Sequence, residues 1–128
     1  MNRPLPTEPL DRHINQNCVP PGPRKLAQFK EALMLRDTPA LYAQEDKEEE
    51  AFVYVKVFDP CGSWTWFITE WDGEDQAFGL VRGHCDELGY FSLAELASVQ
   101  GVMGIGLEID VHFLPQTLGD VKRRGNGL

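Results

Sequence analysis

The sequence has no apolar run long enough to cross a membrane, and it contains little cysteine. No segment approaches the roughly 18 consecutive apolar residues of a membrane-spanning helix, and no apolar stretch follows residues 1–4 to form a secretory signal. The three cysteines, Cys18, Cys61 and Cys85, are odd in number and widely spaced, which argues against a disulfide framework and is typical of a reducing compartment. We therefore expect free thiols, no membrane contact and a cytoplasmic location.

The sequence also lacks the usual spacings of metal ligands. It has no Cys-x-x-Cys motif and no pair of histidines spaced for zinc. Grouped carboxylates between residues 70 and 75 have the oxygen ligands that hard cations prefer, but they lack the spacing and the closing glutamate of a calcium-binding loop. We predict neither a metal nor another cofactor.

Basic residues are scarce in the middle of the chain. The 128 residues include 12 Lys and Arg against 20 Asp and Glu, a net charge of −8. Residues 44–110 carry 15 acidic and three basic side chains, a local charge of −12, and residues 52–91 hold 10 of the 13 aromatic residues. An acidic body repels phosphate. The composition therefore predicts a folded, aromatic-cored body that does not bind nucleic acid directly.

The chain has room for one domain, at about 100 to 200 residues per domain. Residues 1–23 contain six of the nine prolines, so we predict a flexible Pro-rich arm that supplies no core element. Residues 24–118 form a single α+β domain in this interpretation. Residues 119–128 include the basic run 122–124 and are predicted to be a basic flexible tail.

Hydrophobic periodicity predicts the order of the secondary structure. Apolar residues at helical spacing indicate a helix over residues 24–35. Ser92 and Glu95 have the spacing of a capping box, which predicts a second helix starting there. Runs of β-branched and aromatic residues, or strict alternation, predict strands over residues 52–58, 64–70, 77–82, 87–91 and 107–113. We predict an α+β fold with a mainly antiparallel sheet of about five strands and two helices packed on one face.

The densest acidic group surrounds the predicted hairpin turn at Asp72 and Gly73. Carboxylates at a turn often do no more than face water, but on a rigid body they can imitate an array of phosphates and speed association with a cationic groove. Trp71 lies beside the turn, where a partly exposed ring would anchor an interface. The predicted protein-binding residues are Glu70, Trp71, Asp72, Glu74, Asp75, Asp86 and Glu87.

Two pairs have the residue types of catalytic sites. Cys85 follows His84, but adjacent strand residues point to opposite faces, which disfavours a thiolate activated by that imidazole. Asp110 and His112 lie two apart and could form an acid–base dyad, although an ordinary surface pair is the simpler interpretation. The tryptophans of strand 64–70 lack the basic groove of a base-stacking platform, so we assign them to the core. We predict no catalytic residue.

Several strings occur in an order that resembles a known family. They are Leu41-Tyr42-Ala43, Tyr54-Val55-Lys56, Trp64-Thr65-Trp66, residues 69–75, residues 78–81 and residues 87–96. On these motifs the sequence from about residue 41 to 118 resembles a family of small bacterial proteins known only as a domain of unknown function. The resemblance implies a compact, one-domain protein encoded on a plasmid, an integrative element or a phage. It brings no catalytic residues with it.

Two functions from different classes remain open. In the first, the protein is a non-catalytic accessory or binding protein of a bacterial mobile element. Its acidic surface would engage a basic host protein, such as a nucleic-acid-binding protein of a restriction or CRISPR system, as an anti-defence inhibitor does. In the second, it is a small hydrolase or metal-dependent enzyme that uses the carboxylate and histidine clusters. The first is favoured because no recognised catalytic spacing supports the second.

Overall fold

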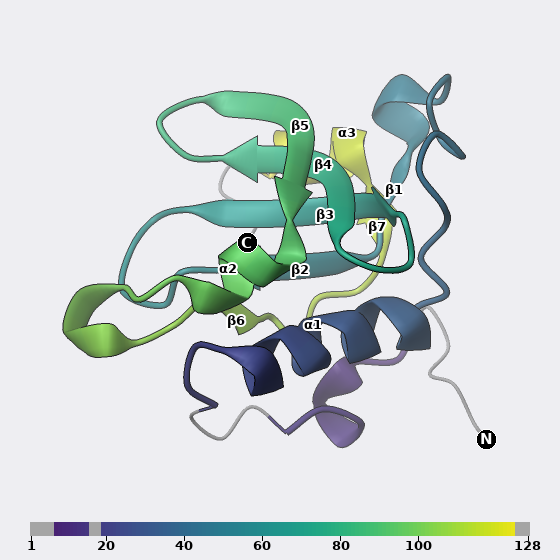
Figure 1. Ribbon diagram of the computed structural model, residues 1–128. Helices are drawn as coiled ribbons and strands as arrows, with labels where there is room; N and C mark the ends of the chain where they lie inside the picture. The colour runs from purple at the N-terminus through teal and green to yellow at the C-terminus, as the bar shows by residue number, and fades with distance from the viewer. Residues whose placement is uncertain (1–6, 16–18, 125–128) are drawn as a thin grey trace.

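A computed structural model describes residues 7–15 and 19–124 of the chain (Figure 1). Its main element is a five-stranded antiparallel sheet in the order β5-β4-β3-β2-β6. The strands of this sheet are β2 (Val55–Phe58), β3 (Thr65–Trp71), β4 (Gln76–Arg82), β5 (Asp86–Ser92) and β6 (Glu108–Ile109). A second, two-stranded sheet pairs β1 (Phe52–Val53) with β7 (Gln116–Thr117). The predicted α+β class with a mainly antiparallel sheet is confirmed.

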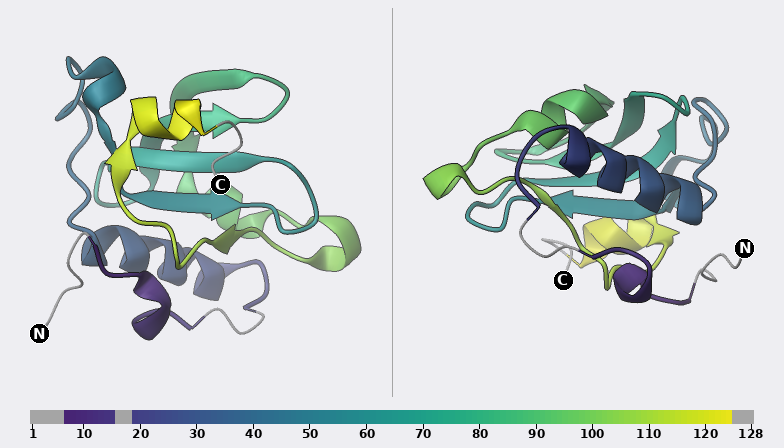
Figure 2. Two further views of the ribbon diagram at one scale, coloured as in Figure 1. Left: turned by 180° about the vertical axis from the view of Figure 1, so that it is seen from behind. Right: turned by 60° about the horizontal axis from the view of Figure 1, so that its bottom comes forward.

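The two predicted helices pack on one face of the sheet, as predicted, and a third helix that was not predicted lies on the opposite face (Figure 2). In the described part of the chain, the α-helices are α1 (Pro23–Leu35), α2 (Leu93–Ser98) and α3 (Leu118–Arg123). Short 3₁₀ turns are η1 (Leu10–Arg12), η2 (Glu48–Glu50) and η3 (Val102–Gly104). The helices α1 and α2 pack against each other on one face, whereas α3 lies on the opposite face.

Two hydrophobic clusters follow from this arrangement. The larger cluster joins α1 and α2 to the sheet through side chains such as Phe29, Leu33 and Ile68, each at most 1 % exposed. The smaller cluster joins α3 to the opposite face of the sheet, where Phe67 of β3 and Leu118 of α3 are both buried. Both faces of the central strands are therefore buried, as expected for strands that are apolar on both sides.

Local sequence signals fix the helix starts. The Ser92 hydroxyl accepts a hydrogen bond from the Glu95 N–H at 3.2 Å, so the predicted N-cap of α2 is confirmed. Pro23 begins α1, where a missing N–H costs nothing. Thr117 caps α3 in the same way as Ser92 caps α2, by accepting from the Asp120 N–H at 3.1 Å.

A β-bulge in β3 reverses which side chains face the two clusters. Ile68 pairs with Gly79 and Glu70 pairs with Phe78, so Thr69 is the extra residue. A Cβ on Gly79 would lie 1.9 Å from the Phe67 carbonyl oxygen, so only glycine allows this close approach. Strict alternation would put Glu70 on the face of Ile68; because of the bulge it faces the other way.

The predicted strands 52–58 and 107–113 are both shorter than expected. The first is interrupted at Tyr54, whose N–H donates to the Ile68 carbonyl beside the bulge. The second ends at Ile109, because Asp110 accepts hydrogen bonds from the N–H groups of His112 and Phe113 and so closes a turn. The first interruption thus keeps a cross-strand hydrogen bond, whereas at the second a local turn replaces the ladder.

Residues 7–15 belong to the core, which corrects the prediction that the Pro-rich arm supplies no core element. Leu10 is 1 % exposed and Ile14 is 4 % exposed, and the Leu10 N–H donates to the Val111 carbonyl at 2.7 Å. The two apolar side chains lie four residues apart, the spacing that places them on one side of a helical turn. The rest of this arm includes residues 1–6 and 16–18, which lie outside the described residues.

The predicted flexible tail begins in a helix. Val121 in α3 is 1 % exposed and packs in the smaller cluster, so residues 119–123 are structured. Residues 125–128 lie outside the described part. The domain boundaries themselves stay predictions. Among residues 7–15 and 19–124, no helix combines the length and apolar character needed to span a membrane.

Candidate binding site

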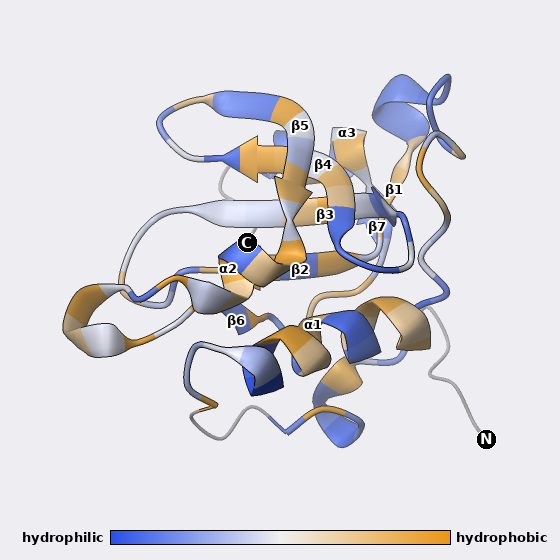
Figure 3. Ribbon diagram, viewed as in Figure 1, coloured by the Kyte–Doolittle hydropathy of each residue, from blue (hydrophilic) through white to orange (hydrophobic). Residues whose placement is uncertain are grey.

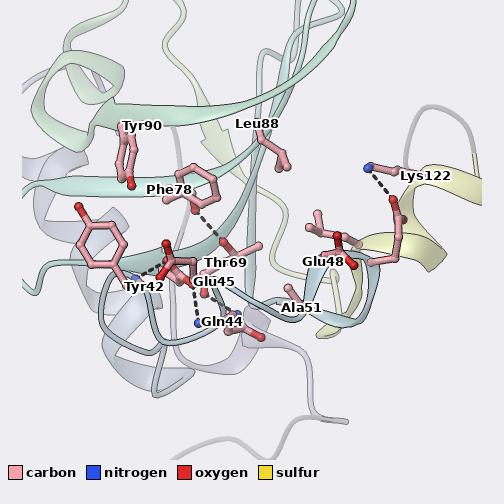
Figure 4. A pocket seen from close by; sticks show the side chains of 13 residues that line it. Tyr42, Gln44, Glu45, Glu48, Ala51, Thr69, Phe78, Leu88, Tyr90 and Lys122 are labelled. Carbon is pink, nitrogen blue, oxygen red and sulfur yellow. Dashed lines mark hydrogen bonds and ion pairs between the residues drawn. The ribbon is translucent and has the colours of Figure 1, made fainter.

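A pocket of about 430 Å³ lies on the α3 face of the sheet, between β5 and the segment that precedes β1 (Figure 4). This volume is within the range of small-molecule and side-chain pockets. Phe78 and Tyr90 are direct cross-strand partners in β4 and β5, so both rings reach the pocket from one face of the sheet. Its lining residues are Tyr42, Gln44, Glu45, Glu48, Glu49, Ala51, Thr69, Glu70, Phe78, Leu88, Tyr90, Leu118 and Lys122.

Glu70 builds one wall of the pocket and holds the neighbouring segment in place. Its Oε1 accepts from the Tyr42 N–H at 2.8 Å and its Oε2 accepts from the Gln44 N–H at 2.7 Å. Gln44 then ties the segment to the sheet, since its amide donates to the Thr69 and Phe52 carbonyls and accepts from the Phe52 N–H. The bulge in β3 is what turns the Glu70 side chain toward this pocket.

The Glu70 carboxylate is a buried charge without a cation beside it. The residue is 4 % exposed, and no Lys, Arg or His of the described residues forms an ion pair with it. Two backbone N–H groups offset part of the cost of burying a carboxylate, but they carry no full positive charge. The wall of the pocket is therefore electrically negative.

Three aromatic rings line the pocket beside Glu70, whose direct cross-strand partner is Phe78. The Phe78 and Tyr90 ring centroids are 4.8 Å apart, and those of Tyr42 and Tyr90 are 6.4 Å apart at 59°. The two tyrosine hydroxyls face each other in Figure 4. The pKa of Tyr90 lies above its ordinary value, first because of a hydrogen bond with the Tyr42 side chain and further because of the negative charges of Glu70 and Glu45. The rings and the carboxylates thus share one small volume.

The backbone is strained at two residues of the pocket. Tyr42 has φ 72° and Glu48 has φ 51°, in the left-handed region that costs a residue with a side chain about 1 kcal/mol. Tyr42 is 59 % exposed although it is held in this conformation. Strain of this kind is concentrated at functional sites, where it presents a side chain in one orientation.

An acidic loop, residues 45–50, forms the rim. It contains five carboxylates and one lysine, and all six residues are exposed (Figure 3). Lys122 of α3 pairs with Glu49 at 2.9 Å, so it offsets the charge of that carboxylate. Glu45 and Glu48 have no side-chain partner among the described residues. Glu45 lies near Tyr42, whereas Glu48 lies toward Lys122 (Figure 4).

The predicted hairpin-tip carboxylates have structural partners. Asp72 accepts from the N–H groups of Glu74, Asp75 and Gln76, and the first of these lowers its pKa most. Asp75 accepts from the Ser92 hydroxyl at 2.7 Å and from the Ala94 N–H at 2.8 Å, so it secures the start of α2. Both carboxylates stabilise the turn and the helix.

Of the other predicted binding residues besides Glu70, one is buried, one forms an ion pair and two are exposed. Trp71 is 7 % exposed in the larger cluster, so the prediction that it is a partly exposed anchor is wrong; the bulge turns it into the core. Asp86 binds Arg82 through both carboxylate oxygens at 3.0 and 2.8 Å, and this lowers its pKa. Glu74 and Glu87 are exposed. None of the seven predicted residues except Glu70 lines the pocket.

The candidate catalytic pairs do not assemble. The His84 ring packs edge-on against Trp64 at 5.5 Å, and the pKa of Cys85 is raised, first by the charge of Glu87, which favours the thiol over the nucleophilic thiolate. The Asp110 carboxylate pairs with Lys56 at 3.4 Å and accepts from the backbone of His112, not from its ring. Within the described residues, no three His, Cys, Asp or Glu side chains group as metal ligands do.

Tyr42, Glu45 and Glu48 were not predicted as site residues, because they lie in a stretch without periodicity. Leu88 and Tyr90 lie two apart on β5, a spacing visible in the sequence, and in the structure their side chains are 51 % and 49 % exposed. Exposed apolar residues two apart on the outermost strand of a sheet mark an accessible surface.

The fold and the pocket together define a small α+β protein with a pocket lined by aromatic and acidic residues. The chain belongs to the family described as "Protein of unknown function (DUF2958)", which matches residues 26–119. No curated protein and no solved structure matches it. The match covers both sheets, α2, the part of α1 from residue 26 onward, and every residue of the pocket except Lys122.

Proposed function

We propose that this protein is a non-catalytic binding protein of a bacterial mobile element, and that its acidic loop engages a basic site on a host protein. One observation supports this most: five exposed carboxylates at residues 45–50 lie beside exposed apolar side chains of the pocket. Apolar contact supplies affinity at an interface, and clustered charge supplies steering and partner choice. The candidate catalytic pairs offer no comparable arrangement.

The favoured partner is a nucleic-acid-binding protein of a defence system. Such a protein presents a cationic groove, and a carboxylate cluster competes for it with phosphate. The protein would then act by occupying the groove rather than by chemistry, as an anti-restriction or anti-CRISPR inhibitor. The acidic loop suits this role because, within residues 7–15 and 19–124, only one of its carboxylates, that of Glu49, is paired with a lysine.

Capture from a host lysate tests the proposal with matched charge reversals. The loop variant carries Asp46→Lys, Glu48→Lys and Glu50→Lys, and the control carries the same number of reversals at exposed carboxylates elsewhere, Asp11→Lys, Glu31→Lys and Glu95→Lys. We expect the wild type and the control to retain the same basic protein, and the loop variant to lose it. Retention should also fall as salt rises from about 50 to about 500 mM. Equal capture by the loop variant contradicts the proposal.

The anti-defence role is tested on the captured protein. With its own nucleic acid bound, that protein should release the nucleic acid as this chain is added, and the loop variant should release none. A ternary complex that keeps the nucleic acid in place contradicts competition for the groove.

A further inference from the structure

We propose that the pocket is a receptor for a single arginine side chain of the basic partner, held against Glu70 and over the rings of Tyr42 and Tyr90. This rests on the proposed function only for the origin of the arginine. The pocket itself is defined by its geometry: a cavity of about 430 Å³ lined by both aromatic rings and carboxylates. Neither an acidic loop nor an aromatic pair alone would select a cation of this shape.

The buried charge of Glu70 indicates a cationic ligand. A carboxylate that is 4 % exposed and has no cationic partner keeps a strong field in its surroundings. Each of its oxygens accepts one backbone N–H and has a second acceptor site left. A ligand with two parallel donors would use both remaining sites and supply the missing positive charge.

The aromatic side of the pocket favours a planar cation. A guanidinium stacks on aromatic faces and is more weakly hydrated than an ammonium, so it is easier to bring into a half-buried site. The Tyr42 and Tyr90 centroids are 6.4 Å apart and tilted by 59°, so the rings form a wedge over which a planar group lies. The exposed fractions of the two tyrosines leave this side accessible.

The two ends of the pocket differ in charge, which orients the ligand. At one end Lys122 pairs with Glu49, and a second cation there would be repelled. At the other end the unpaired carboxylate of Glu45 adds to the field of Glu70, and both act on the Tyr90 hydroxyl. A cationic side chain is therefore directed to the tyrosine end.

Nuclear magnetic resonance titration with short peptides tests this directly. The probes are acetyl-Gly-Gly-Arg-Gly-Gly-amide and two counterparts, with citrulline or lysine in place of arginine. Citrulline has nearly the same shape without the charge, so it isolates the cation. We expect saturable shifts at the amides of Tyr42, Gln44 and Tyr90 with a Kd near about 1 mM for arginine. Citrulline should bind at least about 10-fold more weakly.

Two variants localise the effect without disturbing the fold. Tyr42→Gly removes one ring at a φ of 72° that glycine adopts freely, and Met103→Gly is its control, at φ 59° on a remote, 91 % exposed residue. Glu45→Gln removes one charge, with Glu31→Gln on the exposed side of α1 as its control. We expect Tyr42→Gly and Glu45→Gln each to weaken arginine binding by about 3-fold or more, and both controls to leave it unchanged.

Several results would overturn the inference. They are an absence of localised shifts at about 10 mM arginine peptide, equal binding of citrulline, or tighter binding of lysine. These outcomes are separate from the lysate experiment. If the peptide binds but no basic host protein is captured, only the proposed function fails; if charge reversal abolishes capture while Tyr42→Gly changes neither capture nor peptide binding, only the arginine site fails.

Discussion

The two acidic regions of this protein use the same residue types for different ends. At the hairpin, Asp72 and Asp75 accept five hydrogen bonds, four from backbone N–H groups and one from a serine hydroxyl. In the acidic loop, Glu45 and Glu48 have no side-chain partner among the described residues. Carboxylates beside a turn or a helix start accept hydrogen bonds from the backbone N–H groups that have no other partner there. Only those without such donors nearby stay available for a partner.

Glu70 lies between these two cases and gives the largest expected effect on stability. It is as fully bonded as the hairpin carboxylates, yet it faces the pocket. Glu70→Ala leaves the Tyr42 and Gln44 N–H groups without an acceptor, and we expect a loss of about 3 kcal/mol in the free energy of unfolding. Urea denaturation measures it, with Glu74→Ala as a surface control. A loss below about 1 kcal/mol would show that water replaces the carboxylate without penalty.

Asp75 should have the next largest effect, because it joins the hairpin to α2. Asp75→Ala removes the acceptor of the Ser92 hydroxyl and of the Ala94 N–H, and we expect a loss of about 1 to 2 kcal/mol by urea denaturation. Ser92→Ala removes the same contact from the other side. The double variant should therefore lose less than the sum of the two, by about 0.5 kcal/mol or more. Strict additivity would mean that the two side chains act independently.

Local signals were enough where a structure depends on residues next to one another. Ser92 and Glu95 define the start of α2 by their spacing alone, and the alternation of β3 before the bulge placed Trp66 and Ile68 on one face as observed. The predicted fold class followed from such signals. Leu10 and Ile14 were missed because two apolar residues in a proline-rich stretch resemble a solvated arm until the groove that receives them is known.

The bulge explains why Trp71 is buried although the sequence predicts a partly exposed ring. One extra residue, Thr69, exchanges the faces of everything after it, so Trp71 enters the core and Glu70 leaves it. No residue pattern in β3 predicts the bulge. The residue that indicates it is Gly79 on the neighbouring strand, where a side chain would collide with the Phe67 carbonyl. The pocket also joins residues 42–49 to residues 88–90, a pairing that depends on the sheet order.

The pH dependence of folding stability tests the difference between the hairpin and the acidic loop, with a smaller expected effect. Hydrogen bonds from the Glu74 and Asp75 N–H groups lower the pKa of Asp72 in the folded protein. A carboxyl with a lowered folded pKa stabilises the fold above its unfolded pKa, near about 3.9, and loses this contribution as pH falls through the folded value. Asp72→Asn should remove that part of the acid dependence below about pH 4, as measured by urea midpoints across pH. An unchanged pH profile would contradict it.

The acidic loop should show the smallest effect on stability. Because the Glu45 and Glu48 carboxylates lack partners, Glu45→Gln and Glu48→Gln remove only mutual repulsion, and we expect changes within about 0.5 kcal/mol. Glu48→Gly should stabilise by up to about 1 kcal/mol, since glycine adopts a φ of 51° without strain. Thermal and urea unfolding measure both. A clear loss in Glu45→Gln would mean that this carboxylate is bonded like those of the hairpin, and the loop would then have no free charge to offer a partner.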